Sequence, residues 1–232
     1  MSNQLVIGYG EIGKAVGKNI GEHDFYDLAR GGTTGDSYEI LHICFPFSGV
    51  FVDDVRFYID AFKSEHVIIW STVQIGTTKQ ILGAVHSPVE GKHPDLAMSI
   101  SIMQRWIGLN DSVEGLWWYD YFKDLGLQVK LVTNSDHTEA LKLLSTTEYG
   151  VNIEFARYKQ HVADKIGMDY DLTKDWNIEY NRLYKGLMLD NTFQKYVLDA
   201  PDGPKGGHCV TPNARLLDKQ FPSELTKIVG EL

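Results

Sequence analysis

The stretch Leu5-Val6-Ile7-Gly8-Tyr9-Gly10-Glu11-Ile12-Gly13 decides the fold class of this chain. A short apolar run, typical of a buried strand, leads directly into a complete G-x-G-x-x-G pattern, and residues 14–20 continue with helical spacing. In that setting the first glycine permits a tight turn, the second lets the backbone approach a pyrophosphate, and the third lets the helix pack closely on the strand. Free N–H groups at the helix start favour a bound phosphate. The stretch therefore predicts a dinucleotide-binding loop, with close packing alone as the alternative reason for the glycines.

The first two thirds of the chain alternate short apolar runs with amphipathic stretches. We expect strands at Leu5–Ile7, Asp24–Leu28, Leu41–Phe45, Val67–Trp70, Ala84–His86 and Leu127–Val132. We expect helices over residues 14–20, 52–62 and 77–82. Strands that alternate with helices predict an α/β fold, a Rossmann-type parallel sheet with helices on both faces.

From Ser135 onward the pattern is helical. A long helix is expected over His137–Gly167, with shorter helices at Trp176–Leu189 and Asn191–Val197 and a loop at Ala200–Gly207. Gly150 interrupts the long helix as a candidate kink, and Gly167 suits its C-cap. We place a boundary at Asn134, which gives an NAD-binding Rossmann domain over residues 1–134. Residues 135–232 then form an all-helical dimerisation and substrate region.

A carboxylate is expected about 20 residues after the glycine loop, where it can bind the adenosine ribose. Asp27 stands nineteen residues after Gly8, at the end of the second predicted strand. A carboxylate repels a 2′-phosphate, so Asp27 favours NAD over NADP as the cofactor, whereas the neighbouring Arg30 works against that preference.

Composition excludes several function classes. The 232 residues carry a formal net charge of −9 and are 43% apolar, which fits a folded core and argues against nucleic-acid or anionic-membrane partners. Two cysteines and eight histidines show no disulfide framework and no metal-ligand spacing. Without a signal peptide or a membrane-spanning stretch, we expect a cytoplasmic location.

Several later segments share their order with one known family. They are Ser71-Thr72-Val73-x-x-Gly76-Thr77, Ser87-Pro88-Val89-Glu90, Ala140–Ile153, Ile166-Gly167-Met168-Asp169 and Gly206-Gly207-His208-Cys209-Val210-Thr211-Pro212-Asn213. Together with the glycine loop, they resemble the UDP-glucose/GDP-mannose dehydrogenase family from about Leu5 to Leu217. The chain looks like a truncated form that lacks the C-terminal nucleotide-sugar-binding domain of that family.

The resemblance implies an NAD-dependent oxidation of a sugar-nucleotide alcohol, or of a smaller substrate, and a homodimer paired through the long helix. Cys209 would be the nucleophile and Lys142 would stabilise the oxyanion, which is coherent chemistry for a thiolate beside an ammonium group. Thr72 and Glu90 would hold or activate water. Cofactor contacts would come from a set that the glycine loop and later strand ends supply: Gly8, Tyr9, Gly10, Glu11, Ile12, Gly13, Asp27, Pro46, Ser71 and Thr72.

Two departures from the family pattern leave the chemistry open. Asn213 replaces the aspartate that ends the catalytic loop, and an amide cannot act as a general base at neutral pH. Thr146 replaces the asparagine one turn after the lysine. Two alternatives therefore remain: a two-electron dehydrogenase of the β-hydroxyacid type that uses Lys142 and not Cys209, or an inactive NAD-binding or scaffold protein.

Two further features have a structural and a functional interpretation. The aromatic run Trp117-Trp118-Tyr119, with Tyr121-Phe122, could stack on a sugar, but a helix packed against the sheet or a partner subunit is the favoured interpretation. Cys44, inside an apolar strand, is expected to be a buried hydrophobe.

Overall fold

The computed structural model describes residues 3–32, 35–110, 114–202 and 207–230, and its core is one seven-stranded sheet. The strand order is β2-β1-β3-β4-β5-β6-β7. The strands are β1 (Gln4–Ile7), β2 (Asp24–Tyr26), β3 (Ile40–Ile43), β4 (His66–Ile69), β5 (Ala84–His86), β6 (Arg105–Gly108) and β7 (Val129–Val132). The predicted Rossmann-type fold is confirmed.

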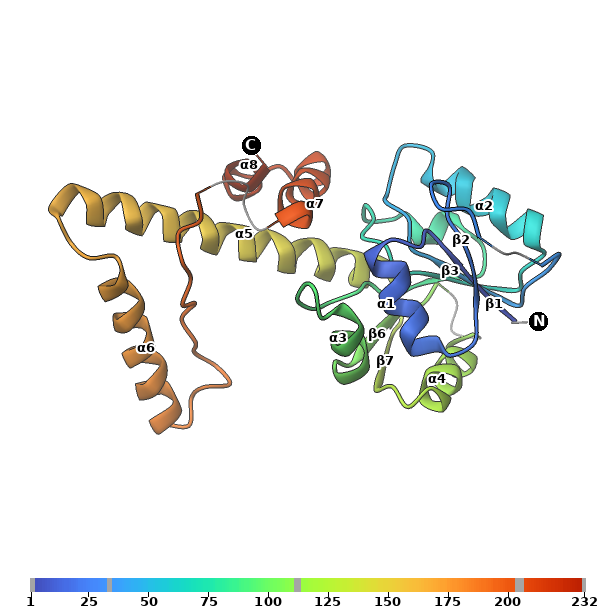
Figure 1. The fold of residues 1–232 in the computed structure, drawn as a ribbon, viewed down its shortest axis with the longest axis horizontal. Helices are drawn as coiled ribbons and strands as arrows, with labels where there is room; N and C mark the ends of the chain where they lie inside the picture. The colour runs from blue at the N-terminus through green and yellow to red at the C-terminus, as the bar shows by residue number, and fades with distance from the viewer. Residues whose placement is uncertain (1–2, 33–34, 111–113, 203–206, 231–232) are drawn as a thin grey trace. The chain divides into compact units, whose positions relative to one another are not determined.

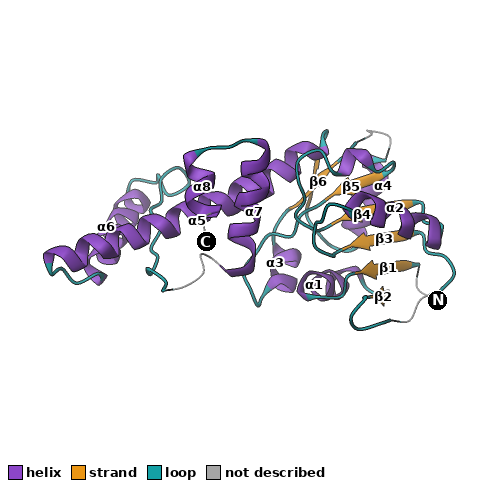
Figure 2. Ribbon diagram, turned by 90° about the horizontal axis from the view of Figure 1, so that it is seen from above, coloured by secondary structure: helices purple, strands orange, loops and turns teal. Residues whose placement is uncertain are grey.

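The first five strands are parallel, and the order of the chain reverses between β1 and β3. Leu5 pairs with Asp24 on one side of β1 and with Leu41 on the other. Figure 2 shows β1, β3 and β4 running side by side. In open parallel sheets such a reversal marks the ligand-binding crevice, outside the carboxyl ends of the strands. The glycine loop after β1 and the loop after β3 flank this point.

The far edge of the sheet differs from the prediction. Strand β6 was not predicted; it pairs antiparallel with β5, with His86 opposite Gly108, and parallel with β7. The helix before it, α3 (Leu96–Ile102), was not predicted either. Short elements of four and seven residues offer too few periods for a hydrophobic pattern to be read.

Helices cover both faces of the sheet. One core cluster joins the sheet to α1 (Glu11–Ile20), α3 and α4 (Gly115–Asp124), and the other joins it to α2 (Phe51–Phe62). The helix predicted over residues 77–82 is a single 3₁₀ turn, η1 (Thr78–Gln80). Figure 1 shows these elements around the sheet.

The chain divides into two compact units, Met1–Lys142 and Leu143–Leu232. The long helix α5 (Ser135–Ile166) belongs to both. The boundary predicted at Asn134 stays a prediction, because α5 runs through the division.

Within the second unit, Gly150 is required by packing against neighbouring helices, and it does not interrupt α5. Figure 1 shows α5 continuing through this part of the chain. A Cβ at Gly150 would lie 2.4 Å from Cγ1 of Val229 on α8 (Glu224–Gly230) and 2.6 Å from Cγ1 of Val210 on α7 (Gly207–Gln220). Glycine therefore lets both helices pack closely on α5. Gly167 has φ +68°, which confirms it as the residue that ends α5.

The helix predicted at Asn191–Val197 is wrong, and the reason lies in α6 (Asp171–Gly186). Residues 193–200 have no regular secondary structure. Side chains of α6 take up the backbone groups of this segment: Asn181 bonds to both the N–H and the C=O of Lys195, and Asn177 donates to the carbonyl of Tyr196. Backbone groups satisfied in this way need no helical ladder.

Candidate functional site

Two of the three loop glycines are required by packing within the chain. Gly8 has φ +88°, and a Cβ there would lie 2.7 Å from the backbone nitrogen of Phe45, at the end of β3. A Cβ at Gly13 would lie 2.2 Å from the carbonyl oxygen of Gly8. Both distances are too short for any side chain, so these residues hold the turn and the start of α1 against the strands.

Gly10 differs from its neighbours because nothing in the structure crowds it. A Cβ there would meet no atom within 4 Å. Its backbone is extended, at φ −78° and ψ −150°, with the negative φ that L-residues adopt, and it forms the N-cap of α1. Packing therefore does not account for this glycine, whereas a ligand that approaches the backbone would.

The other side chains of the loop have contacts within the chain. Tyr9 stacks on Phe25 with ring centroids 4.2 Å apart. Ile12 packs against the core cluster, and Oε2 of the exposed Glu11 lies 3.2 Å from Nδ1 of His93. The backbones of Tyr9 and Ile12, rather than their side chains, are thus available to a cofactor.

Asp27 is held ionised at the end of β2. Its Oδ2 accepts the N–H of Tyr9 at 2.8 Å, and its Oδ1 accepts the N–H groups of Ala29 and Arg30 at 3.0 and 3.1 Å. Burial acts to raise the pKa of Asp27, but these backbone N–H groups and the Arg30 charge outweigh it, so the pKa falls below its ordinary value. The structure brings Asp27 to the glycine loop, as predicted for a ribose-binding carboxylate.

The predicted cofactor residues after β3 and β4 lie at the same edge of the sheet. Ser71 is buried and its Oγ donates to the carbonyl of Phe45 at 2.6 Å, which ties the two strand ends together. Thr72 is half-buried and Pro46 is exposed. Ser71 therefore shapes the edge, while the other two remain accessible.

Lys142 reaches the segment that follows β5. Its Nζ donates to the carbonyl oxygen of Val89 at 2.8 Å, next to the half-buried Glu90. The buried His86, at the end of β5, has a pKa of about 4, because burial lowers it strongly and the Lys142 charge adds to that effect, against the hydrogen bond to the Ser71 carbonyl. The structure therefore brings Lys142 and Glu90 together at the carboxyl edge of the sheet.

Glu139, one helical turn before Lys142, was missed by the sequence reasoning. Its fully buried carboxylate accepts the N–H of Gly76 at 2.6 Å, and the N–H and hydroxyl of Thr78 at 2.8 and 2.6 Å. Burial raises the pKa of Glu139, while these hydrogen bonds lower it in part. The carboxylate fastens the turn after Thr72 to α5. The sequence did hold one signal for this role: Glu139 stands three residues before Lys142, which places both residues on the same face of the helix.

Replacing Glu139 with glutamine should lower the free energy of unfolding by about 2–4 kcal/mol, since the new NH₂ group faces backbone donors that lose their acceptor. Denaturant unfolding measures this. Asp136→Asn is the control, because it removes the more exposed Lys79–Asp136 ion pair between the same two segments; a loss below about 1 kcal/mol is expected there. Equal losses would contradict the assigned role of Glu139.

The remaining catalytic candidates lie in the second unit. Cys209 is exposed in the first turn of α7, so the predicted catalytic loop is helical from Gly207 onward, and Gly206 lies outside the described residues. Asn213 is buried and its Nδ2 donates to the hydroxyl of Thr146 at 3.1 Å. The two residues that depart from the family pattern therefore pair with each other as neutral groups.

The aromatic run of α4 packs into the core, except for Tyr119, which is exposed. Trp118 and Phe122 are fully buried, and Trp117 stacks on His66 with centroids 3.6 Å apart. Cys44 is buried as well. The packing interpretation of these residues is confirmed.

Among the described residues, no three His, Cys, Asp or Glu side chains gather to hold a metal ion. The helices that the structure describes include none with the length and apolar character of a membrane span.

Comparison with solved structures gives the class of fold. A UDP-D-ManNAc dehydrogenase from Pyrococcus horikoshii matches 98% of this chain with a TM-score of 0.76 at 17% identity, and a UDP-glucose dehydrogenase from Pyrobaculum islandicum matches 99% with a TM-score of 0.69 at 16% identity. A 3-hydroxyisobutyrate dehydrogenase from Mycobacterium tuberculosis matches the whole chain with a TM-score of 0.70 at 13% identity.

The share of each neighbour that is covered differs. The chain spans 67% of each of the two sugar-nucleotide dehydrogenases and 92% of the hydroxyisobutyrate enzyme. No family profile and no curated protein sequence matches it. The resemblance predicted from the motifs is thus confirmed for the fold, which is the Rossmann-plus-helix fold of these dehydrogenases.

Proposed function

We propose that this chain is an NAD-dependent dehydrogenase that oxidises a CH–OH group, with Lys142 as the group that binds the alcohol oxygen. One observation carries the proposal: Lys142 is anchored beside Glu90 at the same sheet edge as the uncrowded Gly10. In open α/β sheets, this edge is where cofactor and substrate meet.

Each residue of the site has a separate role in the proposed reaction. The backbone of the glycine loop and the start of α1 bind the pyrophosphate, and Asp27 binds the ribose hydroxyls. A bound nicotinamide would supply the hydride acceptor for the substrate carbon. Lys142 would act as the acid/base for the hydroxyl proton as the carbonyl develops, and Glu90 would hold or activate water nearby. The ionised Asp27 supports NAD over NADP.

Cys209 supports a second candidate, the four-electron oxidation of a sugar-nucleotide alcohol to a carboxylate. Its exposed thiol in the first turn of a helix is accessible to an aldehyde. In this reaction the thiolate would attack the aldehyde, and the second hydride would leave a thioester for water to hydrolyse. The neutral pair of Asn213 and Thr146 favours the two-electron reaction, because it offers no carboxylate base.

The two candidates differ in stoichiometry and in their need for Cys209. We expect the purified protein to reduce one NAD per alcohol when screened against hydroxyacids and nucleotide sugars, with Cys209→Ser retaining most of the rate. Reduction of two NAD per alcohol, together with an inactive Cys209→Ser variant, would establish the four-electron reaction instead. Binding of NAD without any reduction would support the inactive protein.

We also propose a homodimer formed through the helices of the second unit. No residue of α6 is buried, although the helix carries apolar side chains such as Trp176, which is 66% exposed. An apolar helix face of this kind ordinarily lies in an interface.

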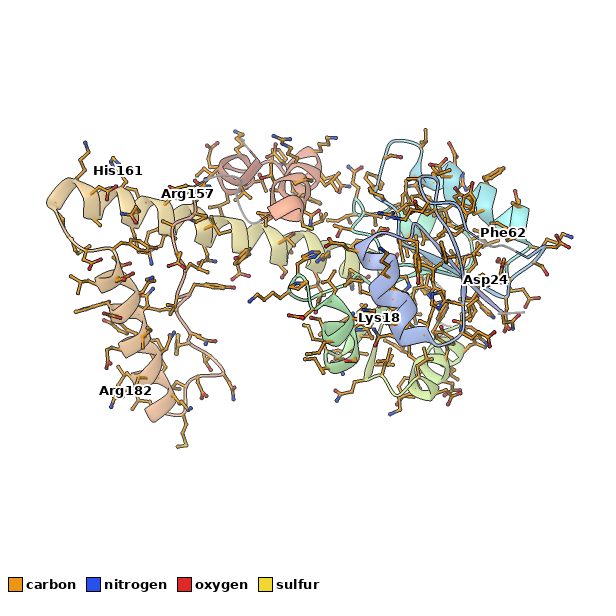
Figure 3. All side chains as sticks on the ribbon, viewed as in Figure 1. Lys18, Asp24, Phe62, Arg157, His161 and Arg182 are labelled. Carbon is orange, nitrogen blue, oxygen red and sulfur yellow. The ribbon has the colours of Figure 1, made fainter. Side chains whose placement is uncertain are left out.

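Trp176→Asp is expected to convert the dimer to a monomer in sedimentation experiments, because it places a charge on that face. Arg182→Asp is the matched control on α6 (Figure 3), since its side chain is already 80% exposed and charged. A dimer that persists in the Trp176 variant would exclude this interface.

A further inference from the structure

Arg105, the first residue of β6, carries a buried charge that the proposed chemistry does not use. The residue is 1% exposed, and its Nε donates to the carbonyl of Met103 at 3.3 Å. Its Nη1 and Nη2 have no hydrogen-bond partner among the residues that the structure describes. Arginine keeps its charge in proteins, and an unpaired buried charge is costly. An acidic partner is therefore expected.

The sheet register places Arg105 beside the segment that ends in Glu90. His86 of β5 lies opposite Gly108 of the antiparallel β6. Because antiparallel strands run in opposite directions, the segment that follows His86 leads back along β6 in the direction of Arg105. Glu90 lies in this segment, and its charge raises the pKa of Arg105 against the larger lowering effect of burial.

A second unpaired polar group faces the same side of the sheet. Val85, Val89 and Ile107 share one core cluster, and the alternation of side chains along strands then puts Ser87 and Arg105 on that side as well. Ser87 is fully buried, and its Oγ has no partner within the described ranges. An unpaired hydroxyl and an unpaired guanidinium thus lie on the same side of two neighbouring strands, and one carboxylate between them would satisfy both.

Glu90 can supply that carboxylate. Its backbone is held in place, since a Cβ on the following Gly91 would lie 2.2 Å from Cβ of Ser99 on α3. Its own side chain is only half-buried, so it can turn about its side-chain bonds.

We propose that Arg105, together with the Ser87 hydroxyl, is a positioning residue that binds the Glu90 carboxylate and fixes its direction at the active-site edge. The ion pair stands independently of any reaction. Its consequence for turnover rests on the role of Glu90 in the proposed function.

Whether Arg105→Met raises or lowers the unfolding equilibrium constant tests the ion pair. If Arg105 binds Glu90, Arg105→Met leaves the carboxylate without its partner, and the unfolding equilibrium constant should rise about tenfold, on the scale measured for coupled side chains. If Arg105 has no partner, methionine removes a costly buried charge, and that constant should fall. A fall would overturn the proposal.

Glu90→Gln completes the cycle and does not depend on how the Met variant folds. It should raise the unfolding constant about tenfold in the natural background and change it less than about twofold in the Arg105→Met background. Equal effects in the two backgrounds would show that the side chains do not interact.

Measurement of kcat distinguishes a positioning role of Arg105 from an effect on stability alone. Arg105→Lys, which keeps a charge but not the planar fork, should lower kcat about tenfold with KM unchanged, and Glu90→Gln should not lower it further in that background. If no alcohol is oxidised by the unaltered protein, the proposed function fails, while the stability cycle still decides the ion pair.

Discussion

Aspartate in place of Gly10 should abolish cofactor binding without weakening the fold. Gly10 has a negative φ, as L-residues do, and no atom stands where a Cβ would lie. Aspartate is also a favoured N-cap, so the free energy of unfolding should stay level or rise by up to about 1 kcal/mol. The same carboxylate would occupy the phosphate position and repel it, which should raise the Kd for NAD at least about 100-fold, or about 2.7 kcal/mol. Calorimetry and denaturant unfolding measure the two quantities.

Gly13→Ala is the matched control, and the opposite result is expected. Its Cβ would lie 2.2 Å from the Gly8 carbonyl, so the variant should lose about 1–3 kcal/mol of stability despite the better helix propensity of alanine. Unchanged NAD affinity in the Gly10 variant would mean that the loop binds no pyrophosphate, and the cofactor proposal would fall with it.

Lys142→Met should reduce kcat by about 10³-fold while leaving the Kd for NAD unchanged. The loss combines proton transfer, typically worth about 10²–10⁴-fold, with the loss of a cation at the developing negative charge. Steady-state kinetics on whichever alcohol is oxidised gives the number. Lys165→Met, an exposed lysine in the last turn of the same helix, should change nothing.

Lys142→Arg distinguishes proton transfer from anchoring. Arginine can still donate to the Val89 carbonyl and keep a positive charge, but it cannot lose its proton at any working pH. An acid–base role therefore predicts that Arg is nearly as slow as Met. If Arg restores most of the rate, Lys142 only holds the segment before Glu90.

The fold was largely predictable because its signals are local. The glycine loop and the apolar strands β1 to β5 can each be recognised from neighbouring residues, and the long α5 from its periodicity. The elements that were not predicted, β6 and α3, are short, whereas the helix that was wrongly predicted depends on distant partners. The segment after α6 looks helical by composition, but Asn177 and Asn181 take up its backbone groups. The roles of Glu139 and Arg105 likewise depend on which buried groups surround them in space.

The candidate site was only partly predictable for the same reason. Motif order selected Lys142 and Glu90, and the spacing after the glycine loop selected Asp27; the structure brings all three to the expected sheet edge. It also selected Tyr9 and Ile12, whose side chains pack inward. A motif identifies positions in the sequence. Only the contacts in the structure show whether the backbone or the side chain at such a position is available to a ligand.

The unequal crowding of the three loop glycines has an evolutionary consequence. A descendant that no longer needs a dinucleotide would still fold only with glycine at positions 8 and 13, because a side chain at either collides with backbone. Position 10 alone is released from constraint when binding is lost. Substitution at position 10 would therefore distinguish inactive lineages of this fold from active ones. Glycine at positions 8 and 13 would be kept in both.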